Sequence, residues 1–245
     1  MIPKTDYKAI VVLSGGLDST TMLYRVAKYD FRPGEVLALS FNYGQRHVTE
    51  LAYASHSCTR LGVDWHLVDM ECVQALLPGS ALTSDVEVPE GHYADETMKA
   101  TVVPNRNSIM ANVAIGAAVG FGATRLYLGV HAGDHPVYPD CRPEFILQLQ
   151  KLAMTANEGF IAEDFKIECP WLHIEKDHIA SQAYSMGLDF RYTWSCYKGV
   201  TNHCGRCSTC VERLEAIAIA GLSHVDNTEY DDTEYWKEAV GWDSE

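Results

Sequence analysis

The chain has 245 residues, a formal net charge of −14 and 47% hydrophobic residues. This length and composition suit one α/β domain with a small appendage. The negative charge argues against a broad basic groove, so we expect no nucleic-acid partner. No apolar run reaches the roughly 18 residues of a membrane helix, and residues 1–8 lack the apolar stretch of a signal peptide. We therefore predict a cytoplasmic protein with no membrane partner.

The first predicted strand, residues 9–13, ends on a turn of small and polar residues. The stretch at 11–23 is VVLSGGLDSTTML, and a helix is predicted over 19–28. Small residues let backbone N–H groups approach an anion, and the following helix adds its positive end, so the turn predicts a phosphate site. It matches neither the Walker loop, whose lysine is missing, nor G-x-G-x-x-G. The alternative is a tight turn whose helix is capped by Asp18 or Ser19.

Strands and helices alternate along the rest of the chain. Further strands are predicted over 35–41, 64–70 and 125–130, and further helices over 47–61, 107–120, 144–157, 176–185 and 208–220. This alternation predicts a doubly wound, mostly parallel sheet with helices on both faces, a Rossmann-like α/β fold. Ligands of such sheets bind at the carboxyl ends of the strands, which is where Ser14 begins the first turn.

One connection, residues 78–105, is longer than a simple crossover requires. It holds three prolines and two glycines among many acids, with no clear periodicity. Loops of that length are uncommon and often form lids or binding loops. A lid or binding loop and a plain surface insertion are both compatible with this composition.

Four of the eight cysteines gather at Cys196, Cys204, Cys207 and Cys210. In a cytosolic chain we expect reduced thiols and no disulfides. The spacing C-x7-C-x2-C-x2-C suits one tetrahedral Zn²⁺ with a closed shell, that is, a structural site. An iron–sulfur cluster is the alternative, although Leu214 stands where a ferredoxin motif would place its fourth cysteine; unmetallated thiols are a further one.

The end of the chain is acidic. Residues 226–245 carry eight acidic residues against one lysine, which predicts a solvated tail. Trp236 and Trp242 leave open a docked arrangement on the body of the protein or on a partner subunit.

The first turn resembles the pyrophosphate loop (PP-loop) of the ATP-pyrophosphatase superfamily through its S-G-G-x-D-S string, residues 14–19. The resemblance implies an adenine nucleotide alpha hydrolase-like fold. It also implies an ATP whose α-phosphate is attacked by a substrate oxygen to give an adenylate, with Asp18 near Mg²⁺. The ATP-binding residues implied in this way are Leu13, Ser14, Gly15, Gly16, Leu17, Asp18, Ser19, Thr20, Thr21, Met22 and Leu23.

Three more stretches and the cysteine cluster narrow the resemblance to the 7-cyano-7-deazaguanine synthase family, over about residues 8–220. They are SFNYGQRH at 40–47, VPNRNSIMANVA at 103–114 and GVHAGDHPVYPDCRPEF at 129–145. The family converts 7-carboxy-7-deazaguanine and ammonia into the nitrile, through an adenylated carboxylate and then an activated amide. The resemblance also implies a structural zinc at the four cysteines and a homodimer.

Arg106 is expected to neutralise the substrate carboxylate or the α-phosphate, because arginine suits planar anions. With Asp18 and Ser14 it forms the expected catalytic set. Acidic side chains are expected at the guanine edge and further arginines at the phosphates, the alternative for each being an ion pair or a helix cap. The substrate-contact candidates are Tyr43, Gln45, Arg46, Arg106, Asn107, Asp134, Tyr138, Asp140, Arg142 and Glu144. Three histidines near strand ends or the cysteines are expected to be structural: His131, His135 and His203.

The chain departs from the family pattern at two places. Asn105 stands where the family has glycine; asparagine is the residue best able to replace glycine at positive φ, so the turn is expected to survive. Residues 135–137 also differ. This leaves open a relative that adenylates the same acid but stops at the amide or transfers it to another amine. A tRNA-modifying PP-loop enzyme and a zinc module that binds nucleic acid are further alternatives, and both conflict with the acidic charge.

The predicted organisation has three parts. A PP-loop ATP-binding α/β domain spans residues 1–195, a four-cysteine zinc site with its helix spans 196–222, and the acidic tail spans 223–245.

Overall fold

A computed structural model describes residues 6–45, 48–74, 76, 79–84, 86–92 and 96–242. Within them, five parallel strands form one sheet in the order β3-β2-β1-β4-β5. The strands are β1 (Ala9–Val12), β2 (Val36–Asn42), β3 (Asp64–Asp69), β4 (Arg125–Tyr127) and β5 (Lys166–Glu168). The chain moves outward from β1 to β3 and then returns to place β4 on the other side of β1. The predicted doubly wound parallel sheet is confirmed, with its switch point between β1 and β4.

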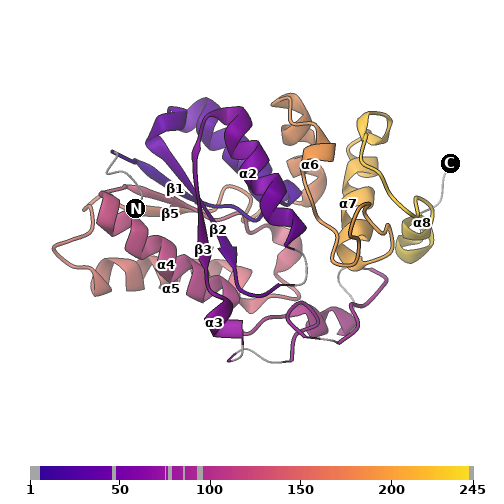
Figure 1. The fold of residues 1–245 in the computed structure, drawn as a ribbon, viewed down its shortest axis with the longest axis horizontal. Coiled ribbons are helices and arrows are strands. Elements are labelled where there is room, and N and C mark those ends of the chain that lie inside the picture. The colour runs from indigo at the N-terminus through magenta and orange to yellow at the C-terminus, as the bar shows by residue number, and fades with distance from the viewer. Residues whose placement is uncertain are drawn as a thin grey trace.

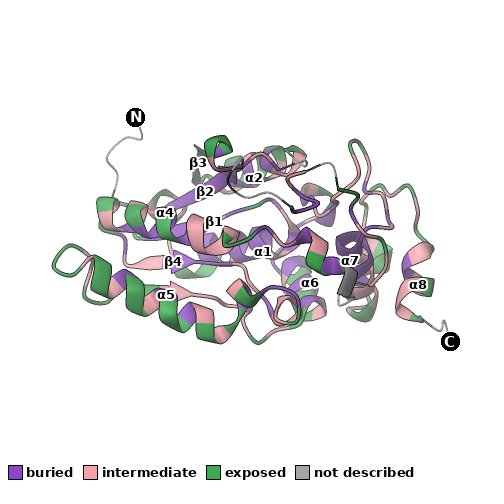
Figure 2. Ribbon diagram, turned by 90° about the horizontal axis from the view of Figure 1, so that it is seen from below, coloured by how far each residue is buried: buried purple, intermediate pink, exposed green. Residues whose placement is uncertain are grey.

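Helices cover both faces of the sheet. They are α1 (Leu17–Arg25), α2 (Thr49–Leu61), α3 (Glu71–Gln74), α4 (Arg106–Phe121), α5 (Pro143–Ala156), α6 (Lys176–Ser185), α7 (Ser208–Ile219) and α8 (Tyr235–Val240). Helices α4 and α5 pack against one face, where Ile10 and Leu37 point, and α1 and α2 pack against the other, where Val11 and Ala38 point (Figure 1). Figure 2 shows the resulting buried strands β1 and β2 and the exposed outer side of α5.

Most predicted elements agree with the structure to within a few residues. Helix α6 has both of its predicted ends, and α4 and α5 differ from prediction by one residue at each end. The predicted helix over 19–28 begins two residues earlier, at Leu17, and ends in a π-helical turn over Val26–Asp30. Strand β5 was not predicted, because three residues are too short for a recognisable alternation.

The acidic C-terminal segment is docked on the body of the protein. Its helix α8 packs on α7, and Trp236 is only 5% exposed, with its ring 5.2 Å from that of Trp242. The guanidinium of Arg206 donates to Asp232 at 3.1 Å. Of the two arrangements considered, a free solvated tail and a docked one, the described residues of this segment therefore adopt the docked one, because the buried Trp236 and a cationic partner hold it in place.

The long connection at 78–105 packs over the cysteine cluster where the structure describes it. Ala81 and Val88 are buried in the same apolar cluster as Cys207, and residue Glu90 forms a β-bridge with Cys207. The carboxylate of Glu90 accepts from Lys198 at 2.8 Å. In Figure 1 the described parts of this segment lie between α3 and the N-terminal end of α7. It is thus anchored at this end of the molecule, and its role as a lid stays a prediction.

Candidate active site

A cavity of about 240 Å³ lies at the carboxyl ends of β1 and β4, at the switch point of the sheet. Leu13 and Ser14 line it after β1, and Leu128 and Gly129 line it after β4. A Cβ on Gly129 would lie 3.2 Å from the Cα of Ser19, so the segment after β4 passes close to the start of α1 there. The cavity lies where ligands bind in sheets of this class.

The first turn brings hydroxyl and amide groups to this cavity. The hydroxyls of Ser14 and Ser19 are 2.9 Å apart. The backbone N–H of Ser14 donates to the Ser19 hydroxyl at 3.2 Å, and that of Gly16 donates to the Ser14 hydroxyl at 3.3 Å. Gly16 is the N-cap of α1, so the positive end of the helix lies at the same place. Such an arrangement suits a bound phosphate.

Only part of the stretch predicted to bind ATP reaches the cavity. The residues that line it are Leu13, Ser14, Gly16, Asp18 and Ser19. The others do not line it: Gly15, Leu17, Thr20, Thr21, Met22 and Leu23. Most of these lie on α1, and its helical period turns Leu17, Met22 and Leu23 into the apolar core.

Gly15 has a backbone conformation that a side chain would disturb. Its φ is +96°, and a Cβ would lie 2.1 Å from the carbonyl oxygen of Glu50. We expect Gly15→Ala to lower the melting temperature and to reduce ATP-dependent activity at least about tenfold, since positive φ alone costs about 1–3 kcal/mol. Gly116→Ala is the control, because Gly116 lies on α4 with open space around it and helical alanine is favoured by about 1 kcal/mol. Equal melting temperatures for Gly15→Ala and the parent would contradict this account.

A buried charge cluster forms one wall of the cavity. The ammonium of Lys176 lies 3.0 Å from Asp18 Oδ2 and 2.7 Å from Glu212 Oε2. The Nε2 of His131 lies 3.6 Å from Asp134 Oδ1, 3.8 Å from Glu212 Oε1 and 3.9 Å from Asp18 Oδ2. A backbone N–H donates to His131 Nδ1 at 3.1 Å, which places the ring proton on Nε2, facing the carboxylates.

One carboxylate oxygen of the cluster has no hydrogen-bond partner among the described residues. Burial alone would raise the pKa of Asp18, but the ammonium of Lys176 outweighs it, so the pKa lies below its usual value and the group is ionised. Its second oxygen, Oδ1, is buried with no hydrogen-bond partner. Hard divalent cations take carboxylate oxygens as ligands. The unpartnered Oδ1 of Asp18, beside a turn that suits a phosphate, is therefore a suitable ligand for Mg²⁺.

A second wall of the cavity carries Arg106 among tyrosines. Arg106 begins α4 directly after Asn105, which has a φ of 61° and is the one non-glycine residue with positive φ in the described part of the chain. The expectation that asparagine preserves this turn is confirmed. Burial lowers the pKa of Arg106, but Tyr43, Tyr197 and Tyr138 raise it, with a net rise that keeps the guanidinium charged. This wall suits a planar aromatic acid.

Three further substrate-contact candidates line the cavity: Asn107, Asp134 and Asp140. The carboxylate of Asp140 accepts from the backbone N–H of Asn107 at 3.1 Å. This contact orders the first turn of α4, on which Arg106 lies.

Other candidates lie elsewhere. Arg142 and Glu144 are exposed and do not line the cavity, and Arg142 Nε donates to a backbone carbonyl, that of His135, at 2.8 Å. Gln45 is 4% exposed, and its amide groups bond within the protein. Arg46 lies outside the described residues.

Several cavity residues had no contiguous sequence signal. Lys176, His131, Glu50 and Glu212 all line the cavity. Lys176 lies in a stretch without a nucleotide-binding pattern, and His131, although it lies in the 129–145 stretch of the family resemblance, was expected to be structural. Glu212 follows Cys210 by two residues, so the cysteine loop was the one available clue to it.

Glu50 is held at the cavity by Gln45, whose Nε2 donates to Glu50 Oε1 at 3.1 Å. Burial raises the pKa of Glu50 to about 7. Between the usual carboxyl pKa and pH 7, the folded state therefore binds more protons than the unfolded state, and the free energy of unfolding falls as pH rises. We expect Glu50→Gln to have a higher melting temperature than the parent at pH 8 and a similar one at pH 4.5. Parallel melting curves for the two proteins across this pH range would contradict the assignment.

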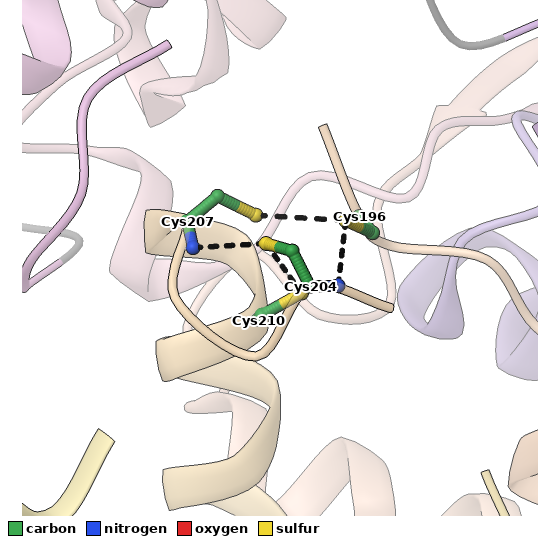
Figure 3. A group of neighbouring side chains, drawn as sticks. All are labelled: Cys196, Cys204, Cys207 and Cys210. Atoms are coloured by element: carbon green, nitrogen blue, oxygen red, sulfur yellow. Dashed lines mark hydrogen bonds between the residues drawn. The ribbon is translucent and has the colours of Figure 1, made fainter. Parts of the chain in front are cut away.

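The four clustered cysteines converge at the N-terminus of α7 (Figure 3). Their sulfur atoms lie within 4.8 Å of one another. Backbone N–H groups donate to two of them: Gly199 N to Cys196 Sγ at 2.9 Å and Cys207 N to Cys204 Sγ at 3.2 Å. Hydrogen bonds from Cys204, Cys207 and Cys210 lower the pKa of the Cys196 thiol. Four close sulfurs with amide donors fit a thiolate-bound metal ion.

The cysteine cluster and the cavity share one stretch of chain. Tyr197 follows Cys196 directly and lines the cavity, as do Thr209 and Glu212 on either side of Cys210. The hydroxyl of Thr209 donates to the Ser195 carbonyl at 2.7 Å. A metal at the cysteines would therefore position a wall of the cavity.

Comparison with known proteins gives consistent matches. A family model described as "Queuosine biosynthesis protein QueC" matches residues 8–221. The chain is 49% identical over 233 residues to the 7-cyano-7-deazaguanine synthase of Rhizobium etli, covering 95% of this chain and 96% of that one. The Agrobacterium fabrum synthase is 48% identical over 234 residues, with coverage of 95% and 96%. The solved U34-tRNA thiolase NcsA from Methanococcus maripaludis aligns with a TM-score of 0.48 and 17% identity over 98% of this chain and 75% of that chain.

No helix of the described residues is long and apolar enough to cross a membrane.

Proposed function

The chain belongs to the QueC family of queuosine biosynthesis proteins, and we propose that its cavity converts 7-carboxy-7-deazaguanine, ammonia and ATP into 7-cyano-7-deazaguanine. This activity is that of a carbon–nitrogen ligase. The observation that supports the assignment to this cavity is the meeting of Ser14, Asp18 and Arg106 on its walls. They are the three residues expected from the sequence to carry the chemistry.

The first half of the reaction makes the carboxylate reactive. A carboxylate is a poor electrophile, whereas its adenylate has AMP as a leaving group. The N–H groups and hydroxyls of the first turn suit the β- and γ-phosphates, and Lys176 offers a positive charge to the departing pyrophosphate. Bound at Asp18, Mg²⁺ would neutralise phosphate charge. Arg106 holds the carboxylate in line with the α-phosphate.

The second half replaces AMP with nitrogen. Ammonia attacks the acyl carbon, AMP leaves, and the amide forms. The amide oxygen then takes a second adenylyl group in the same site, and loss of AMP with the remaining N–H protons gives the nitrile. One site serves both cycles if the deazaguanine stays bound between them, because proximity replaces a strong protein nucleophile.

The metal at the cysteines is proposed to be a single structural Zn²⁺, since four thiolates close a tetrahedral shell and leave no open position. Elemental analysis separates zinc from an iron–sulfur cluster. We also propose that the protein is a homodimer and is cytoplasmic. The three-part division of the chain at residues 195 and 222 is likewise a proposal.

Incubation of the pure protein with 7-carboxy-7-deazaguanine, ATP, Mg²⁺ and ammonium, followed by mass spectrometry, tests the function. The nitrile is the expected product, and it should be absent with Asp18→Ala and Ser14→Ala proteins that remain folded and metal-loaded. An amide end product or an amine adduct would assign the chain instead to a relative that shares only the adenylation step, a candidate that the departure at residues 135–137 supports. No consumption of the acid would overturn both.

A further inference from the structure

Glu50 reaches the cavity because α2 packs unusually close to the first turn. A Cβ on Gly15 would lie 2.1 Å from the Glu50 carbonyl oxygen and 3.0 Å from the backbone nitrogen of Ala54. The absence of that Cβ lets the first turn of α2 press against the phosphate-binding turn. The Glu50 carboxyl consequently lines the same cavity as Ser14 and Arg106.

The position of the carboxyl is set by Gln45. The Gln45 Oε1 accepts from the backbone N–H of Tyr43 at 2.9 Å, and its Nε2 donates to the Phe41 carbonyl at 3.0 Å and to Glu50 Oε1 at 3.1 Å. Both amide protons are therefore used. Gln45 is a positioning residue for Glu50, and its buried amide leaves no donor for a substrate.

Glu50 differs from Asp18 and Glu212 in the charge of its hydrogen-bond partner. Asp18 and Glu212 each contact the Lys176 ammonium, whereas the hydrogen bond to Glu50 comes from a neutral amide. The groups that interact electrostatically with Glu50 are Arg106 from α4 and the tyrosines Tyr43 and Tyr197. Burial outweighs these interactions and raises the pKa of Glu50 to about 7, so the carboxyl exchanges protons near neutral pH.

We propose that Glu50 is the group that accepts protons from nitrogen in this cavity. The inference rests on the proposed function, in which Arg106 holds the acyl group. As the ammonia lone pair forms the C–N bond, the C–O bond to AMP breaks, AMP leaves with the electron pair, and one N–H proton passes to the Glu50 carboxylate. Glu50 releases that proton to solvent before the second cycle. The amide oxygen then bonds to phosphorus, pyrophosphate leaves, and one N–H proton passes to the Glu50 carboxylate, which again releases it to solvent. When AMP then departs, the last N–H proton passes to Glu50 and the C≡N bond is complete.

Glu50→Gln tests this role, because it keeps the size and the hydrogen bond of the side chain but removes its basicity. Glu71→Gln is the matched control: Glu71 is an exposed carboxylate on α3 that accepts from Asn42 outside the cavity. Two reactions are measured for each protein. Adenylation is followed without ammonium, as exchange of labelled pyrophosphate into ATP that depends on the acid. Amide and nitrile formation is followed with ammonium.

The expected result is a split between the two reactions. Glu50→Gln should keep pyrophosphate exchange within about threefold of the parent and lose about 10²-fold or more of product formation, the usual contribution of a general base. Below pH 7, log kcat/KM for total ammonium should rise by about two per pH unit in the parent, one from ammonia and one from Glu50, and by about one in Glu50→Gln.

Two results would overturn the role of Glu50. One is an equal loss of pyrophosphate exchange and of product formation in Glu50→Gln; the other is unchanged product formation with the same slope of log kcat/KM against pH as in the parent. Failure of the proposed function is a different outcome. In that case the parent and the Glu71→Gln protein would themselves show no exchange that depends on the acid.

Discussion

Lys176→Met is expected to abolish product formation, with a loss of at least about 10²–10³-fold in the adenylation reaction. Lys176 is 8% exposed and lies between Asp18 and Glu212, so the change also leaves two buried carboxylates facing each other. Breaking a buried pair costs about 3–5 kcal/mol, which for a chain of this size lowers the melting temperature by about 6–20 °C. Pyrophosphate exchange and thermal unfolding measure the two effects.

Two controls separate catalysis from stability. Lys151→Met, on the exposed side of α5, should leave both measurements unchanged. The double variant Lys176→Met with Glu212→Gln removes one of the opposed charges, so it should recover part of the melting temperature without recovering activity. Recovery of both together would mean that Lys176 acts only through folding.

Cys210→Ser is expected to remove the metal, lower the melting temperature and inactivate the protein together. The four sulfurs lie within 4.8 Å of one another, and three thiolates no longer close the shell. Loss of a structural metal is among the few single changes that cost more than about 4 kcal/mol, which lowers the melting temperature of a chain of this size by at least about 8 °C. Because Thr209 and Glu212 flank Cys210 on α7 and line the cavity, we expect activity to fall at least about tenfold even where the protein remains folded.

Metal content, melting temperature and product formation are measured on the same preparation. Cys72→Ser is the matched control, since Cys72 is an exposed free thiol on α3. We expect elemental analysis to find one zinc per chain in the parent and in the control, and less zinc in Cys210→Ser. A Cys210→Ser protein with full activity and no metal would show that the cysteine cluster does not shape the cavity.

The amino-acid sequence alone was enough to predict those sites whose residues are close together along the chain. The first turn, residues 14–19, could be predicted because strand, small residues and helix follow one another directly. The cysteine cluster could be predicted because its last three cysteines lie within one loop and one helical turn. The conformation of Asn105 followed from its place in a short turn, and its φ of 61° agrees. In each case a short stretch of backbone decides the geometry.

Tertiary structure alone decided which distant side chains meet. Lys176, Asp18 and Glu212 come from three helices, α6, α1 and α7, and no local pattern reports their contact. Likewise, Gln45 was predicted to bind substrate, but its amide bonds within the protein and holds Glu50. Periodicity and turn residues report backbone shape, whereas ion pairs and shifted pKa values depend on the packing of helices against the sheet. That packing is a property of the whole chain.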